Sequence, residues 1–139
     1  PESASVGYPL PDREGLTDIT VNFPLYNGVR RVEVGVKPGS LLGVPTPHTV
    51  PLPLGVYGSS ITQGACASRP GLCYAAHLAR WIDAPMINTG CSGNGMGQPA
   101  MADFLGSRPM SVLVMDYDYN ALSVDWLRDT HESFFRRIR

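Results

Sequence analysis

Three hydroxyl residues, Ser59, Ser60 and Thr62, directly follow the apolar run 54–58. Such a run is typical of a buried parallel strand, which passes to its helix through a short loop at the carboxyl edge of the sheet, where open α/β folds collect their chemistry. A serine in that loop can attack an acyl carbonyl when a neighbouring base takes its proton. The same residues can instead cap the following helix, so the segment alone leaves both interpretations open.

Serine attack on an ester forms an oxyanion, which fixed hydrogen-bond donors must stabilise. Two later strand-like runs, 85–88 and 110–116, are followed by segments that contain Gly93 and Asn120. Because loops after parallel strands lie along one edge, Ser60, Gly93 and Asn120 can converge there. Ser60 and Gly93 would offer backbone N–H groups, and Asn120 would offer its carboxamide N–H. Alternatively, Gly93 only permits a turn with positive φ and Asn120 only caps a helix.

An alternation of strand-like and helical segments after residue 54 would place these loops. The apolar residues of segment 74–82 recur at helical spacing, which predicts an amphipathic helix. The pattern as a whole predicts an α/β domain with a parallel sheet. The predicted strands are 54–58, 85–88 and 110–116, and the predicted helices are 74–82, 99–105 and 124–139.

The residues before this domain have a different character. Two β-type runs, 19–25 and 29–36, are joined through Asn27-Gly28, a dipeptide that strongly favours a hairpin turn. Four prolines make segment 41–54 a stiff extended connector that cannot be helical. Two units are therefore expected, a β-rich segment with a proline-rich connector over 1–50 and an α/β unit over 51–139.

Composition excludes several classes of function. The chain has 139 residues, of which 43% are hydrophobic and 17% charged, which suits one globular domain with one core. Eleven basic and twelve acidic residues give a net charge of -1 without a basic run, so a nucleic-acid partner is not expected and a small neutral or weakly charged substrate fits better. No apolar run approaches the roughly 20 residues of a membrane span. No signal peptide is visible, but the chain begins at Pro1, so a secreted or periplasmic location stays open.

The three cysteines, Cys66, Cys73 and Cys91, include no Cys-x-x-Cys pair, so a zinc site is not predicted. No other metal and no cofactor is expected either. Cys66 and Cys73 flank a short loop that could close a disulfide in an exported protein. The alternative is a pair of free thiols.

The residues that could do chemistry also resemble a known family. Segment 58–62, Gly-Ser-Ser-Ile-Thr, resembles the Gly-Asp-Ser-Ile-Thr block of the SGNH (GDSL-type) hydrolases. Gly93 within 88–94 resembles their second block, and Asn120 falls where their third-block asparagine belongs. The chain looks most like bacterial members in which a β-rich segment precedes these blocks. The resemblance implies a flavodoxin-like three-layer α/β/α fold and hydrolysis of acyl esters, often acetyl groups on carbohydrates, with Ser60 as nucleophile and Ser60, Gly93 and Asn120 as oxyanion hole.

The sequence departs from the family pattern at several positions. Ser59 replaces the usual aspartate, and Asp118 and Ala121 surround Asn120 where glycine and aspartate are commoner. The general base of the family comes from an Asp-x-x-His block near the end of a complete domain, and this sequence has no such block. We therefore expect the chain to stop at Arg139 before that block, to be nearly inert by itself, and to self-associate through an incomplete sheet edge.

Three histidines, His48, His77 and His131, are the other candidates for a general base. A base must come within roughly 2.6–3.2 Å of the serine hydroxyl. His48 lies in the proline-rich connector, and His77 and His131 lie in predicted helices, away from the expected strand edge. We therefore expect all three to be packing or surface residues.

Two other functions stay open from the sequence. A Ser/Thr/Gly loop can bind the phosphate of a flavin or nucleotide, although no Gly-x-Gly-x-x-Gly or Walker pattern supports this. A non-catalytic carbohydrate-binding module would instead use aromatic side chains to stack on sugars. The candidates for that stacking are Tyr26, Tyr57, Tyr74, Tyr117, Tyr119 and Trp126, and we interpret Asp116 and Asp118 as polar strand-end residues rather than catalytic acids.

Overall fold

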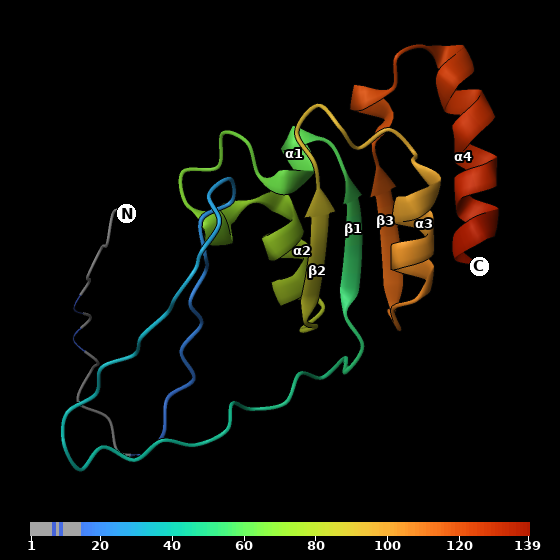
Figure 1. Ribbon diagram of the computed structural model, residues 1–139. Coiled ribbons are helices and arrows are strands. Elements are labelled where there is room, and N and C mark those ends of the chain that lie inside the picture. Colours follow the sequence, from blue (N-terminus) through green and yellow to red (C-terminus); the bar gives the residue numbers. More distant parts are fainter. Residues whose placement is uncertain (1–6, 8, 10–14) are drawn as a thin grey trace.

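Three parallel strands form the centre of the computed structural model, which describes residues 7, 9 and 15–139. β1 (Leu54–Gly58) lies between β2 (Met86–Gly90) and β3 (Val112–Asp116) and is parallel to both. The order β2-β1-β3 is that of the first three strands of a flavodoxin-like sheet. The predicted α/β fold with a parallel sheet is confirmed, and Figure 1 shows the three strands side by side.

All three strands end at the same edge of the sheet (Figure 1). Gly58, the last residue of β1, is paired with Gly90 of β2 and with Asp116 of β3. The loops that leave these three residues lead to Ser60, Gly93 and Asn120, as the sequence predicts.

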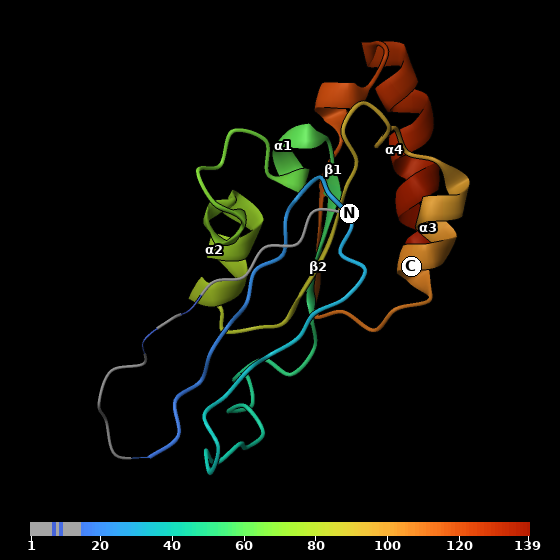
Figure 2. The ribbon, with the colours of Figure 1, turned by 60° about the vertical axis from the view of Figure 1, so that its left-hand side comes forward.

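Helices cover both faces of the sheet, which makes three layers (Figure 2). One face carries α2 and the opposite face carries α3 and α4. Within β1, Leu54 and Val56 pack toward α2, and Tyr57 packs toward α3 and α4. The helices are α1 (Ser60–Gln63), α2 (Tyr74–Trp81), α3 (Pro99–Gly106) and α4 (Val124–Ile138), with 3-10 turns η1 (Pro70–Leu72) and η2 (Asp118–Asn120).

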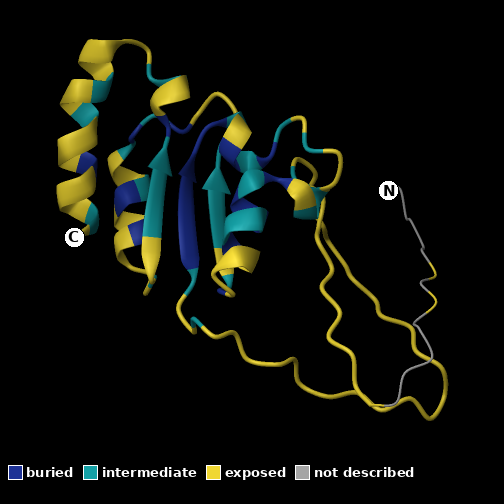
Figure 3. Ribbon diagram, turned by 180° about the vertical axis from the view of Figure 1, so that it is seen from behind, coloured by how far each residue is buried: buried dark blue, intermediate teal, exposed yellow. Residues whose placement is uncertain are grey.

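The two faces of β1 are packed differently. On the α2 side the buried helix residues are the alanines Ala75, Ala76 and Ala79, whose small side chains let the helix lie close to the sheet. On the other side the ring of Tyr57 stacks on Phe134 of α4 with 4.8 Å between centroids, a geometry that adds to the gain from burial. The whole of β1 is buried, so it is the covered central strand of the sheet (Figure 3).

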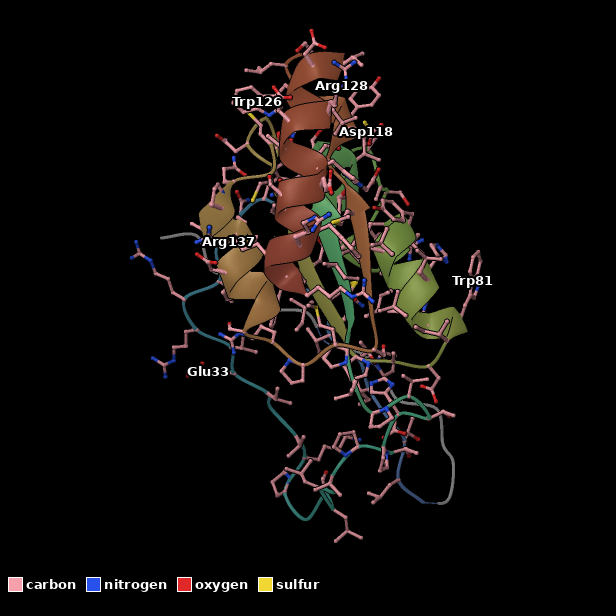
Figure 4. All side chains as sticks on the ribbon, turned by 90° about the vertical axis from the view of Figure 1, so that its right-hand side faces the viewer. Glu33, Trp81, Asp118, Trp126, Arg128 and Arg137 are labelled. Atoms are coloured by element: carbon pink, nitrogen blue, oxygen red, sulfur yellow. The ribbon has the colours of Figure 1, made fainter. Side chains whose placement is uncertain are left out.

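An ion pair at the surface joins α3 to α4. Arg137 of α4 donates to Asp103 of α3 through two nitrogens, one of them at 2.9 Å from Oδ2. Figure 4 shows the Arg137 side chain reaching from α4 toward α3. Both partners are more than half exposed, so the pair fixes how the helices meet more than it stabilises the fold.

The predicted N-terminal hairpin is wrong for the residues that the structure describes. Residues 15–50 contain no strand, although the chain bends at Leu25–Asn27, close to the predicted turn. The alternating valines Val32, Val34 and Val36 of the second arm are 48 to 76% exposed, and Ile19, Val21 and Phe23 of the first arm are 52 to 62% exposed. Neither arm therefore buries an alternating apolar face. An isolated two-stranded hairpin is only marginally stable without such burial, and most of this segment loops away from the sheet, with its bend close to α1 and α2 (Figure 1). The part of the predicted β-rich unit on residues 1–6, 8 and 10–14 lies outside the described residues.

The predicted elements of the domain are confirmed, and no end differs from its predicted position by more than two residues. The last predicted strand begins at residue 112 rather than 110. Just before it, Ser111 donates its N–H to Pro53 O, ahead of β1. In the described part of the chain, the outer edges of β2 and β3 have no strand partner.

Candidate active site

Two adjacent serines at the end of β1 have different environments. Ser59 is 1% exposed and is the N-cap of α1, where its Oγ accepts from Ile61 N at 3.2 Å. Ser60 is the first residue of α1 and is half-buried. Within the described chain, neither its Oγ nor its N–H has a hydrogen-bond partner. The capping interpretation therefore holds for Ser59 and not for Ser60.

Glycines let the three strand ends approach one another closely. A Cβ on Gly58 would lie 2.3 Å from Asp116 O, and one on Gly90 would lie 2.2 Å from Gln63 N. A Cβ on Gly95 would lie 2.3 Å from Gly58 O. Real Cβ atoms are not found this close to backbone atoms. Side chains at these positions would therefore push α1 and the loop after β2 away from the sheet.

Gly93 lies in an exposed turn directly after β2. Its φ is +69°, a left-handed conformation that glycine adopts readily in a turn. A Cβ there would meet no atom within 4 Å, which leaves the space above its backbone open. The neighbouring Asn94 and Gly95 both donate their N–H to Cys91 O at 3.1 Å, whereas the N–H of Gly93 has no acceptor among the described residues.

Asn120 follows β3, on the other side of β1 from β2, and reaches the same turn. It is the last residue of η2, and its Nδ2 donates to Cys91 O at 3.1 Å. Ser123, not Asn120, is the N-cap of α4, so the helix-cap interpretation of Asn120 is wrong. A carboxamide nitrogen carries two N–H donors, and the bond to Cys91 leaves one of them for another acceptor.

A polar network beneath α1 holds the serine turn in place. Asp116 Oδ2 accepts from Thr62 Oγ1 at 2.8 Å and from the Tyr74 hydroxyl at 2.6 Å. Burial, followed by the hydrogen bond to Asp116, raises the pKa of Tyr74 to about 12. Asp116 is thus a structural strand-end residue, as the sequence interpretation has it, and it connects β3 to both α1 and α2.

Two residues in these contacts escaped the sequence analysis. Asn88 of β2 donates from Nδ2 to Thr62 O at 2.8 Å and accepts from Gly90 N at 2.9 Å. Gln63, the last residue of α1, accepts from Ser92 N at 3.0 Å. In the sequence, each is only a polar residue in a stretch of small or apolar residues. That pattern does not reveal hydrogen-bond partners that are 26 and 29 residues away.

None of the three histidines is hydrogen-bonded to Ser60 in the described part of the chain. His48 Nδ1 lies 2.9 Å from Asp83 Oδ1, at the amino edge of the sheet, and the five residues of β1 separate that edge from Ser60 by about 16 Å. His77 lies 3.2 Å from an Arg80 nitrogen on α2, and His131 stacks on the ring of Tyr117. All three make packing or surface contacts, as expected.

Of the six aromatic residues considered for sugar stacking, Tyr74 is half-buried with its hydroxyl bonded to Asp116, and the other five divide into two groups. Tyr57 and Tyr117 are core residues, 0 and 1% exposed, so they cannot present a ring to a glycan. Tyr26 and Tyr119 are more than half exposed, and Trp126 is 39% exposed and donates from Nε1 to Met96 O. The exposed members lie on separate segments, and Figure 4 shows Trp126 at one end of α4.

The three cysteines are unpaired, with Cys66 exposed, Cys73 buried and Cys91 half-buried. The described residues hold no group of three or more histidine, cysteine or acidic side chains suited to a metal ion. In the same part of the chain, no helix combines the length and the apolar character that crossing a bilayer requires.

The fold and the carboxyl-edge loops define a three-layer α/β domain with a serine turn after its first strand. The family model of the GDSL-like lipase/acylhydrolase family matches residues 52–139. The chain therefore belongs to the GDSL-like lipase/acylhydrolase family.

A crystal structure of a candidate GDSL-like lipase from Bacteroides ovatus is similar to this chain, with 38% sequence identity and a TM-score of 0.59. The match covers 63% of this chain and 26% of the other, so the chain spans about a quarter of the length of that protein. No functionally curated protein matches the chain.

Proposed function

We propose that this chain carries the nucleophile and the oxyanion hole of a serine ester hydrolase. Ser60 is the nucleophile, and the oxyanion is held by Ser60 N, Gly93 N and Asn120 Nδ2. The observation that carries the proposal is that, within the described residues, Ser60 and Gly93 have free N–H groups on adjoining loops, while their neighbours are engaged. Family membership gives the reaction class.

The proposed reaction follows the chemistry of serine acyl transfer. A general base takes the proton of the Ser60 hydroxyl as Oγ bonds to the carbonyl carbon, and the carbonyl oxygen becomes an oxyanion. Collapse of this intermediate breaks the ester C–O bond and releases the alcohol, which takes up the proton. Water then hydrolyses the acyl-serine. The base is supplied by a group other than the three histidines, whose contacts all lie elsewhere.

The proposed substrates are short acyl esters, acetyl esters above all, with carbohydrates among their alcohols. This specificity rests on the resemblance of segments 58–62 and 88–94 to the family blocks. The exposed, open turn at Gly93 is compatible with a bulky alcohol outside the site.

Hydrolysis of p-nitrophenyl acetate and octanoate by the protein at its natural length tests the proposal. Ser60→Ala should lower kcat at least about 1000-fold with either ester, and acetate should be the better substrate. Ser59→Ala is the matched control because it removes the adjacent hydroxyl. It should cost about 1 kcal/mol of stability through loss of the cap and leave kcat within a few fold. Equal activity of Ser60→Ala and the wild type would refute the proposal.

The sheet edges support a separate proposal of self-association. The outer edges of β2 and β3 are unpaired in the described chain, and Val112 of β3 is 51% exposed. Unpaired edges are available to a second chain. Sedimentation that shows a monomer at all concentrations would contradict it.

A further inference from the structure

Gln63 joins three separate segments of the chain through one side chain. Its Nε2 donates to Leu25 O at 2.9 Å, and its Oε1 accepts from Ser92 N at 3.0 Å. Leu25 belongs to the N-terminal segment, Gln63 to α1, and Ser92 to the turn after β2. We propose that Gln63 is a positioning residue that sets the distance between Ser60 and Gly93, an inference that rests on the proposed function.

The backbone of Gln63 is itself held firmly. α1 is a single turn, and residues three apart lie on one face of a helix, so Ser60 and Gln63 are neighbours on that face. The end of β2 packs directly against this backbone, because a Cβ on Gly90 would lie 2.2 Å from Gln63 N. A side chain that starts from such a fixed point can hold another segment at a defined distance from Ser60.

The turn that Gln63 holds needs such a restraint. Asn94 N and Gly95 N donate to Cys91 O and close the turn on itself, while Cys91 N donates to Gly58 O and Asn120 Nδ2 donates to Cys91 O, which joins the turn to β1 and η2. None of these bonds joins the turn to α1. Ser92 directly precedes Gly93, whose glycine backbone has wide conformational freedom. The bond from Ser92 N to Gln63 therefore restrains the turn next to the proposed oxyanion donor.

The second arm of Gln63 brings the N-terminal segment into the same unit. The Leu25 side chain packs against the end of α1, since a Cβ on Gly64 would lie 2.5 Å from Leu25 Cδ1. The Tyr26 hydroxyl donates to Ser60 O at 3.3 Å. The bend at Leu25–Asn27 thus supports α1 on the side where β2 lies, because residues 21–25 line one hollow together with Gln63 and the β2 residues Met86, Asn88 and Gly90. Gln63 connects the bend to the turn after β2.

Two substitutions separate these contacts. Gln63→Met keeps the length of the side chain and loses both hydrogen bonds. Gln63→Glu can still accept from Ser92 N but cannot donate to Leu25 O. We expect Gln63→Met to lower kcat for p-nitrophenyl acetate about 100-fold, as for a misplacement of about 1 Å, with KM within about threefold. Hydrogen exchange of the Ser92 amide should be slow in the wild type and in Gln63→Glu, and at least about tenfold faster in Gln63→Met.

Thr49→Val is the matched control, because it removes a polar contact with Asp83, 2.6 Å long, at the opposite edge of the sheet. It should lower stability without changing kcat. If Ser60→Ala stays active, both the proposed function and this inference fail. If activity depends on Ser60 but Gln63→Met keeps kcat within about twofold, only the inference fails. Should Gln63→Met not fold, the wild type decides: a Ser92 amide that exchanges as fast as that of Gly93 overturns the inference.

Discussion

Two neighbouring serines at the end of β1 have different roles, since one caps α1 and the other is the proposed nucleophile. Ser59 is buried, and its hydroxyl oxygen accepts the hydrogen bond that caps α1. Ser60 is half-buried, and its hydroxyl has no hydrogen-bond partner in the described chain. Burial, not residue type, therefore distinguishes the structural serine from the proposed nucleophile. Asp116 is half-buried like Ser60, and its hydrogen bonds from Thr62 and Tyr74 are what mark it as a structural residue.

Asn120 gives a test at the scale of the residue. If its second N–H binds the oxyanion, Asn120→Ala should lower kcat about 100- to 1000-fold and change KM little. Steady-state kinetics with p-nitrophenyl acetate measures both constants. Asn27→Ala, at an exposed asparagine in the N-terminal bend, is the control and should leave both unchanged. A rise in KM at constant kcat for Asn120→Ala would show that the side chain binds substrate and transition state equally.

At the scale of the element, the site depends on how closely α1 approaches β2. Gly90→Ala would place a methyl group 2.2 Å from Gln63 N and 2.6 Å from Gln63 Cα. Neither backbone atom can yield without moving α1. We expect a loss of at least about 2 kcal/mol in the free energy of unfolding, with Ser60-dependent activity falling more than the folded fraction does.

Gly35→Ala provides the comparison, because a Cβ there meets no atom within 4 Å. Denaturant unfolding should show this variant within about 0.5 kcal/mol of the wild type. If both alanine variants unfold at the same denaturant concentration, the close contact between β2 and α1 is not a determinant of stability.

Local patterns were enough to predict the elements of the domain. The apolar run 54–58 and the periodic segment 74–82 correspond to β1 and α2 within one residue. The prediction of a hairpin was wrong because Asn27-Gly28 favours only the turn. Pairing of the two arms also needs a buried apolar face, and the valines are exposed. The network of Asp116 could not be predicted, since its partners Thr62 and Tyr74 are 54 and 42 residues away in sequence.

At the scale of the whole molecule, Asp83 attaches the N-terminal connector to the domain. Its carboxylate accepts from Thr49 N at 2.9 Å and from Thr49 Oγ1 at 2.6 Å, and it pairs with His48. The hydrogen bonds from Thr49, followed by the contact with His48, lower the pKa of Asp83 to about 2. These contacts join the chain before β1 to the chain before β2.

This shift predicts a pH dependence of stability. A carboxyl group whose pKa is lower in the folded state stabilises the fold above its unfolded pKa of 3.8, and the contribution is lost as pH falls toward about 2. Asp83→Asn removes the titration and tolerates the positive φ of 50° at this position. The difference in unfolding free energy between wild type and Asp83→Asn should therefore shrink between pH 5 and pH 2. A difference that stays constant over this range would contradict the assignment.

Covalent labelling shows whether Ser60 is the nucleophile. The protein at its natural length is treated with a fluorophosphonate, and the modified residue is mapped by peptide mass spectrometry. We predict one adduct, on Ser60, that is absent from Ser60→Ala and present in Ser59→Ala. An adduct on another residue, or ester hydrolysis that continues without any adduct, would contradict the account.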